Sequence, residues 1–145
     1  MTIARCILVA TDFSEPSGHA VQYAAELCAK LGARLVLVHA YGLPAYVMPI
    51  EGSMMASPQY AADLVVRLQD QLDAEVAKLA SRGIAIETKL VLGPAYLEIV
   101  RVAQECGADL IVVGTHGRSG LSHAIMGSVA ERVVRLSPTP VLSVR

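Results

Sequence analysis

The chain has 145 residues, of which 54% are hydrophobic and 4% aromatic, and its formal net charge is −1. This length suits one domain with one sizeable core, and the charge balance disfavours nucleic acid as the main partner, because phosphate contacts need clustered Lys and Arg. No apolar run approaches the length of a membrane span, and the first residues lack the pattern of a signal peptide.

Strand-like and helical segments alternate from the start of the chain. The block C-I-L-V-A, Cys6–Ala10, predicts the first strand, and apolar residues at helical spacing predict a helix over 14–31. A second strand is expected over 34–40. The stretch 41–57 is rich in Gly, Pro and Met and has no clear periodicity. A Ser-Pro pair then opens a second helix, which we expect over 57–82.

The second half of the chain continues this alternation. Residues 84–92 alternate apolar and polar side chains, which is typical of an edge strand. A helix is expected between Pro94 and Gly107, followed by a strand over 109–114. A last helix over Ser128–Leu136 and a short strand over 141–145 end the chain.

Such βα alternation predicts a parallel sheet with right-handed crossovers. The first, second and fourth strands are continuous apolar runs and should be central, which leaves the third and fifth as edges. We therefore predict one domain over residues 1–145, a three-layer α/β/α sandwich whose five-stranded parallel sheet has the order 3-2-1-4-5. In that order, a ligand should bind between the carboxyl ends of the first and fourth strands.

Two segments should line that crevice. One is the turn A-T-D-F-S after the first strand, and the other is the loop G-T-H-G-R-S-G-L-S-H-A-I-M-G-S, from Gly114 to Ser128. The loop is rich in glycine and hydroxyl groups, it contains Arg118, and it leads into a helix whose free N–H groups and dipole favour an anion. These features indicate a phosphorylated ligand. In an alternative interpretation, Ser128 and Glu131 form a capping box that serves the helix alone.

Other polar residues near the crevice allow more than one interpretation. The carboxylate of Asp12 could accept hydrogen bonds from sugar hydroxyls or hold a metal, or Asp12 and Glu15 could cap the first helix. His39, at the end of the second strand, is expected to anchor backbone near the crevice. His116 and His123 have no third ligand at metal spacing, so we interpret them as surface or loop-packing residues.

The three cysteines lie in separate apolar blocks, at Cys6, Cys28 and Cys106. Their odd number and wide separation do not fit a disulfide framework or a metal knuckle. We expect buried thiols in a reducing cytosol.

The loop's spacing, Gly114-x2-Gly117-x9-Gly127-Ser128, matches the nucleotide motif G-x2-G-x9-G-[ST] of the universal stress proteins. The opening I-L-V-A-T-D-F-S-E, the V-H-A after the second strand and the closing P-V-L-S-V also resemble that family, and the resemblance covers the whole chain. It implies an α/β sandwich of the adenine nucleotide alpha hydrolase type, a cytoplasmic location, and ATP as the ligand of members with this motif.

The resemblance also implies a role for each matching residue. Ala10 and Thr11 would line the adenosine, Asp12 would lie near the ribose, and the backbone of Ala40 would meet the adenine. The ribose and phosphates would be held by Gly114, Gly117, Gly127, Ser128 and Val129. Arg118 is a further candidate phosphate partner, and Asp12 could meet a Mg²⁺ ion bound to the nucleotide.

A homodimer is the other implication of the resemblance. The last strand is short, apolar and at a sheet edge, and unpaired edges invite pairing with another copy. Val141, Leu142 and Val144 would then meet a two-fold mate in an isologous contact. A protected monomer edge is the alternative.

The chemistry of the loop favours binding over catalysis. It lacks the lysine of a G-K-[ST] P-loop and contains no carboxylate that could position a water. We therefore predict a nucleotide-dependent regulatory module of the stress response, with at most weak ATP hydrolysis. Two alternatives remain open: a stress protein that binds no nucleotide and acts through dimer and partner contacts, and a slow ATPase.

Overall fold

The computed structural model describes residues 4–43, 58–115 and 126–145. Its strands form one parallel sheet in the order β3-β2-β1-β4-β5, so the predicted fold class and strand order are confirmed. The strands are β1 (Cys6–Ala10), β2 (Arg34–Tyr41), β3 (Ile86–Leu92), β4 (Leu110–Gly114) and β5 (Val141–Val144).

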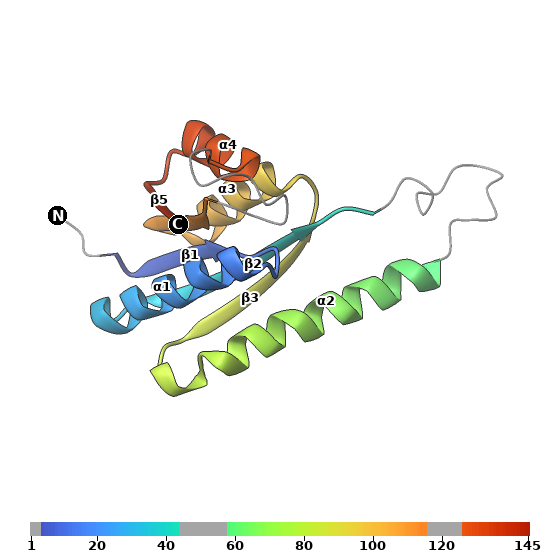
Figure 1. Cartoon of the computed structure of the whole chain (residues 1–145), viewed down its shortest axis with the longest axis horizontal. Coiled ribbons are helices and arrows are strands. Elements are labelled where there is room, and N and C mark those ends of the chain that lie inside the picture. Colours follow the sequence, from blue (N-terminus) through green and yellow to red (C-terminus); the bar gives the residue numbers. More distant parts are fainter. Residues whose placement is uncertain (1–3, 44–57, 116–125) are drawn as a thin grey trace.

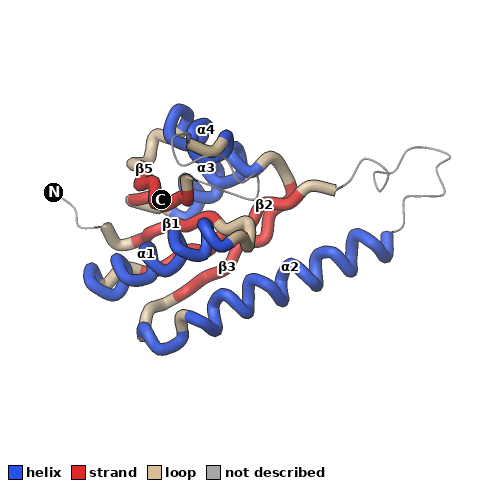
Figure 2. The backbone as a smooth tube through the Cα atoms, in the orientation of Figure 1, coloured by secondary structure: helices blue, strands red, loops and turns tan. Residues whose placement is uncertain are grey.

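Helices cover both faces of the sheet (Figure 1, Figure 2). Helices α1 and α2 pack on one face and α3 and α4 on the other. The helices are α1 (Glu15–Leu31), α2 (Pro58–Lys78), α3 (Ala95–Cys106) and α4 (Ser128–Leu136), with a 3₁₀ turn, η2 (Ala80–Arg82), after α2.

The sheet has a hydrophobic core on each of its two faces, because successive side chains along a strand point to opposite faces. In β1, Ile7 and Val9 face the layer of α1 and α2, whereas Leu8 faces the layer of α3 and α4. All three side chains are fully buried. Strand β3 at one edge is only partly buried, as its alternating sequence predicts. No helix among the described residues is long and apolar enough to cross a membrane.

Some element boundaries differ from those expected. The second helix ends at Lys78 rather than near residue 82, because the chain tightens there into η2 and Gly83 then adopts φ 66°. The third strand begins at Ile86, two residues later than expected. Pro58 is the first residue of α2, as expected, whereas residues 44–57, which include Ser57 and most of the irregular stretch, lie outside the described residues.

One glycine fixes how α3 leaves the sheet. Gly93 adopts φ 149°, and its N–H donates to the carbonyl of Tyr41 at 2.9 Å. A Cβ at this position would lie 2.9 Å from Cγ of Glu98 in the first turn of α3. Glycine therefore lets α3 begin directly beside the end of β2, which brings its first turns to the carboxyl edge of the sheet.

Candidate functional site

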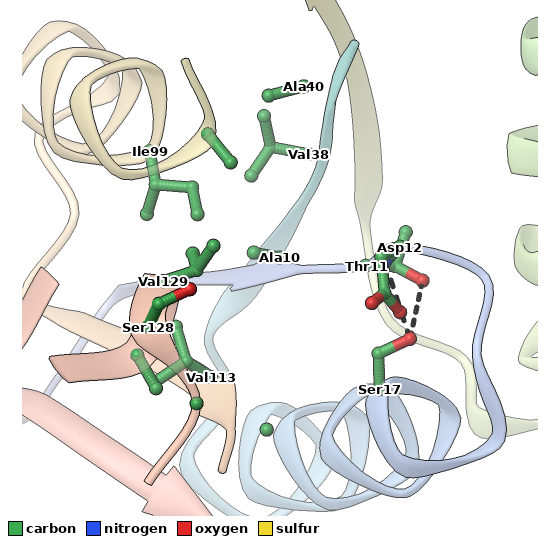
Figure 3. Close-up of a pocket in the computed structure, with 14 residues that line it drawn as sticks. Ala10, Thr11, Asp12, Ser17, Val38, Ala40, Ile99, Val113, Ser128 and Val129 are labelled. Carbon is green, nitrogen blue, oxygen red and sulfur yellow. Dashed lines mark hydrogen bonds between the residues drawn. The ribbon is translucent and has the colours of Figure 1, made fainter. Parts of the chain in front are cut away.

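A cavity of about 290 Å³ lies at the carboxyl ends of β1 and β4 (Figure 3). The chain passes from β1 to β2 on one side and from β4 to β5 on the other, so this is the topological switch point of the sheet. The cavity is lined by Ala10, Thr11, Asp12, Ser17, Val38, Ala40, Ala95, Ile99, Val113, Gly114, Gly127, Ser128, Val129 and Ala130.

Most of the candidate binding residues named from the sequence are brought together here. Eight of them line this one cavity: Ala10, Thr11, Asp12, Ala40, Gly114, Gly127, Ser128 and Val129. The other two, Gly117 and Arg118, lie outside the described residues, as do His116 and His123.

Six further residues line the cavity that were not predicted from the sequence: Ser17, Val38, Ala95, Ile99, Val113 and Ala130. Of these six, Val38 could have been found by pairing the first two predicted strands, because it lies opposite Ala10 in the register of β1 and β2. Ala95 and Ile99 gave no such signal, since they reach the cavity only because α3 packs across β2. Figure 3 shows Val38, Ala40 and Ile99 on the same side of the cavity.

The turn after β1 carries its own hydrogen bonds. Oδ1 of Asp12 accepts from the backbone N–H of Ser14 at 3.0 Å and from the Ser14 hydroxyl. Ser14, not Asp12, is the N-cap of α1, and its Oγ accepts from the N–H of Ser17. The interpretation of Asp12 as a helix cap is therefore wrong, because Asp12 instead closes a short turn onto the capping residue.

Ser17 orients the polar side of the cavity. Its hydroxyl donates to the carbonyl of Ser14 at 3.0 Å, so its oxygen accepts from the hydroxyl of Thr11 at 3.1 Å and from the N–H of Asp12 at 3.3 Å. Thr11 in turn accepts from the N–H of Phe13 at 3.0 Å. Figure 3 shows Thr11, Asp12 and Ser17 together on one side of the cavity.

His39 holds the same turn from β2. Its Nδ1–H donates to the carbonyl of Thr11 at 2.7 Å, and its ring lies 4.4 Å from the ring of Phe13. Phe13 has φ 64°, a conformation that costs a non-glycine residue roughly 1–2 kcal/mol. The ring contact and the hydrogen bond offset that cost, and the expectation that His39 anchors backbone at the crevice is confirmed.

The start of α4 forms the opposite wall. Gly127 is the N-cap of α4, no described side chain caps it, and Ser128 is the first helical residue. The interpretation of Ser128 as the N-cap of a capping box is therefore wrong. The first bond within the helix runs from the N–H of Glu131 to the carbonyl of Gly127, so the N–H groups of residues 128–130 have no acceptor within α4.

Gly127 closes this wall against β4. Its N–H donates to the carbonyl of Thr115 at 2.5 Å, and a Cβ on residue 127 would lie 2.9 Å from that carbonyl oxygen. Any larger side chain must therefore move the start of α4 away from the end of β4. The absence of a side chain here keeps the amino end of the helix, with its partial positive charge, at the edge of the cavity.

The sheet order and the place of the cavity define a doubly wound α/β protein whose cleft has an apolar side, a hydroxyl-rich side and a helix N-terminus. The described residues contain no group of three or more His, Cys, Asp or Glu arranged to hold a metal. Residues 4–145 match the model of the universal stress protein family, and the chain belongs to this family.

Relatives of known sequence or structure span nearly the whole chain. Universal stress protein MJ0531 of Methanocaldococcus jannaschii is 33% identical over 141 residues, which cover 96% of this chain and 81% of that protein. The solved structure of MJ0577, from the same organism, has a TM-score of 0.83 at 25% identity and covers 99% of this chain and 96% of that one. A crystal structure of a universal stress protein in complex with cAMP has a TM-score of 0.74 at 29% identity, with 99% and 98% of the two chains covered.

Proposed function

We propose that this protein is an adenine-nucleotide-binding regulatory module of the stress response, that ATP is its ligand, and that it acts in the cytoplasm. The observation that carries the proposal is the convergence of eight candidate binding residues, named from the sequence, on one cavity. The solved relative in complex with cAMP, at 29% identity, supports an adenine nucleotide as the class of ligand.

The chemistry of the cavity walls suits each part of a nucleotide. Val38, Ala40 and Ile99 provide an apolar surface for a flat base. The Asp12 carboxylate and the neighbouring hydroxyls can accept or donate hydrogen bonds to a sugar. The N–H groups at the start of α4 can donate to phosphate oxygens, as helix N-termini do for bound anions.

The cavity suits a Mg²⁺ ion only when the ion binds together with the nucleotide. Mg²⁺ takes oxygen ligands and is commonly held by one or two carboxylates together with substrate phosphates. Asp12 supplies one carboxylate at the cavity, and its Oδ1 already accepts two hydrogen bonds from Ser14. We therefore expect the phosphates to provide most of the protein-bound ion's non-water ligands.

Binding rather than dedicated hydrolysis is the expected activity. Among the described residues that line the cavity, Asp12 is the only one with a titratable side chain. A phosphoryl-transfer site needs a group that positions the attacking water and cations that stabilise the γ-phosphate. Asp12 is held by Ser14 and is assigned to the sugar, so we expect at most slow turnover.

We also propose that two copies pair through β5. This strand lies at the edge of the sheet, and its apolar side chains, Val141, Leu142 and Val144, are only partly buried. On the adjoining helix α4, Val134 and Leu136 are 47% and 51% exposed. A second copy would cover this apolar surface and the unpaired edge together.

The experiment that tests the nucleotide proposal begins with the protein as purified. Mass spectrometry of ligand released by denaturation should detect an adenine nucleotide. Calorimetry with ATP and Mg²⁺ should then show that Gly127→Ala weakens affinity at least about tenfold, because the new Cβ displaces the start of α4. Gly18→Ala, which adds a Cβ to α1 with nothing within 4 Å, is the matched control and should leave affinity unchanged.

Two results would contradict the proposal. One is the absence of both released nucleotide and measurable heat with ATP in a folded sample. The other is equal ATP affinity in the Gly127→Ala and Gly18→Ala variants, which would place the ligand elsewhere on the protein.

A further inference from the structure

One arginine of α4 has an aromatic ring, rather than a carboxylate, as its partner. The guanidinium carbon of Arg132 lies 4.8 Å from the centre of the Tyr96 ring, which belongs to the first turn of α3. Arg101 and Arg135 pair with glutamates on their own helices, whereas Arg132 takes part in none of the ion pairs among the described residues. Within that part of the chain, no carboxylate neutralises its positive charge.

The Arg132–Tyr96 pair lies beside residues that line the candidate nucleotide cavity. Ala95, which precedes Tyr96, and Ser128, one turn before Arg132 on α4, both belong to the cavity wall. Helical side chains tilt toward the amino end of their helix, so the side chain at position 132 extends over the turn that contains Ser128. Its contact with Tyr96 agrees with this direction, because α3 and α4 contact each other and both begin at the carboxyl edge of the sheet. The guanidinium therefore stands at the rim of the cavity.

The ring of Tyr96 limits where the exposed arginine side chain can go. Tyr96 is half-buried and packs against the core between the sheet and the layer of α3 and α4, so its position is set by the fold. A guanidinium over an aromatic ring is attracted to the negative face of the ring, and the N–H groups at its own edge can still donate. An arginine oriented in this way loses less conformational entropy when it contacts an anion.

The cavity wall itself offers little positive charge to a chain of phosphates. Its described lining contains no Lys or Arg, and Asp12 adds a carboxylate. The amino end of α4 contributes partial charges equivalent to roughly half a positive charge. A nucleoside triphosphate carries more negative charge than a monophosphate and gains more from a nearby cation. Arg132 places a full positive charge beside the same turn of α4.

We propose that Arg132, oriented by Tyr96, binds the phosphate chain of the nucleotide beyond its first phosphate and thereby selects triphosphates over monophosphates. This inference rests on the proposed function, because it assigns a further binding residue to the same cavity. Arg132 contacts the ligand directly, since a guanidinium can donate two parallel N–H···O bonds to phosphate oxygens. Tyr96 is a positioning residue that touches the arginine and not the ligand.

A purely structural role for the pair leads to a different expectation. If Arg132 and Tyr96 only tied α3 to α4, the loss of the arginine would loosen the cavity and weaken every adenine ligand alike. A contact with the phosphate chain instead affects each ligand according to its charge, so ATP should lose most, AMP little and adenosine nothing. The order of these losses therefore separates binding from packing.

The test measures the affinity of the full chain for adenosine, AMP and ATP by calorimetry, in EDTA so that no divalent ion shields the phosphates. The wild-type protein should bind ATP more tightly than AMP. Arg132→Gln should weaken ATP affinity about tenfold or more, because hydrogen bonds to a charged group are lost. Its affinity for adenosine should be unchanged. The loss for ATP should shrink as salt is added, since ions screen a contact at the rim of the cavity.

Three further variants serve as controls. Arg67→Gln removes the same charge from an exposed position of α2, on the other face of the sheet, and should leave all three affinities unchanged. Tyr96→Phe keeps the ring and should bind ATP as the wild type does. Tyr96→Leu removes the ring and should weaken ATP affinity roughly two- to fivefold, because the guanidinium loses the contact that orients it. Melting temperatures show that each variant is folded.

Three outcomes would overturn the role of Arg132 and leave the proposed function standing. They are equal ATP affinity in Arg132→Gln and Arg67→Gln, a loss in Arg132→Gln that is the same for all three ligands or independent of salt, and a wild-type protein that binds AMP as tightly as ATP. In each of them an adenine ligand still binds. A folded wild-type protein that binds none of the three ligands would instead overturn both proposals together.

Discussion

A single hydroxyl, that of Ser17, connects the two polar residues that the nucleotide proposal places beside the sugar. Ser17 is 5% exposed, it accepts from Thr11 and from the backbone of Asp12, and it donates to Ser14. Because its one proton is committed to the Ser14 carbonyl, the direction of each bond is fixed. The turn after β1 is thus preorganised before any ligand arrives, which lowers the entropy that binding must offset.

We predict that Ser17→Ala lowers both stability and affinity. Loss of the hydroxyl leaves the buried Thr11 side chain short of an acceptor, which should reduce the free energy of unfolding by about 1–3 kcal/mol. Denaturant titration measures this change, and calorimetry with ATP should show weaker binding. Ser81→Ala, at an exposed position in η2, is the control and should change neither quantity. Equal ATP affinity in the two variants would contradict the role assigned to Ser17.

A second prediction at this scale concerns pH and Asp109. Hydrogen bonds from the backbone N–H of Arg5, and then of Cys6, lower the pKa of this carboxyl below its usual value of 3.8. A depressed pKa in the folded state means that the ionised group stabilises the fold above the unfolded pKa. That contribution is lost as the pH falls from about 3.8 through the folded pKa.

The free energy of unfolding, measured as a function of pH, tests this expected loss of stability in acid. Asp109→Ala should be less stable than wild type at pH 7, and the two curves should converge as the pH drops below 3.8. Asp70→Ala, on an exposed part of α2, provides the comparison for loss of a surface carboxylate. A difference between Asp109→Ala and wild type that persists undiminished in acid would show that the carboxylate's charge is not its source.

At the scale of elements, α2 is the least integrated helix of the fold. Figure 1 shows it as the outermost helix, alongside the edge strand β3. Of its 21 residues only Leu68 and Leu72 are buried, and Val66 is 59% exposed. The helix therefore depends on a short apolar stripe, and its stability should be concentrated in few side chains.

We predict that truncating two side chains of α2 to alanine changes the free energy of unfolding by very different amounts. Leu72→Ala removes a fully buried side chain and should lower the free energy of unfolding by about 2–5 kcal/mol. Val66→Ala, on the exposed face, should change it by no more than about 0.5 kcal/mol. Denaturant unfolding followed by circular dichroism measures both, and similar losses in the two variants would mean that the exposed face packs against something in solution.

The elements also show what sequence reasoning can and cannot reach. The order of the sheet was predictable because β1, β2 and β4 are continuous apolar runs, whereas β3 alternates. The helix caps were not predictable, because both Asp12 and Ser14 are residue types that can serve as the N-cap of α1. Only the backbone geometry shows that Ser14 is the N-cap. Nor could spacing show that α3 carries Ile99 to the candidate nucleotide cavity.

At the scale of the whole molecule, β5 forms one of the two edges of the sheet. The carbonyls of Pro140 and Val144 accept from residues Ile111 and Thr115, next to β5 in the sheet. Because backbone direction alternates along a strand, the N–H groups of Val141 and Ser143 point away from β4. They are the groups that a second copy would pair with in the proposed dimer.

We predict that Ser143→Pro converts a dimer into a monomer. Proline removes an outward N–H but is tolerated in an edge strand, so the fold should persist. Light scattering should show the mass fall from about twice the chain mass of 15.3 kDa to that mass. Ser143→Ala keeps the N–H and should stay dimeric. A dimer that survives the proline variant would place the interface on another face.

The candidate nucleotide cavity takes its walls from residues as early as Ala10 and as late as Ala130. On the ribosome, Ala130 is made 120 residues after Ala10. A nascent chain that has not yet reached Ala130 therefore lacks one wall of the cavity. Occupancy, and any signal that depends on it, can begin only once the start of α4 has been made and packed against the sheet.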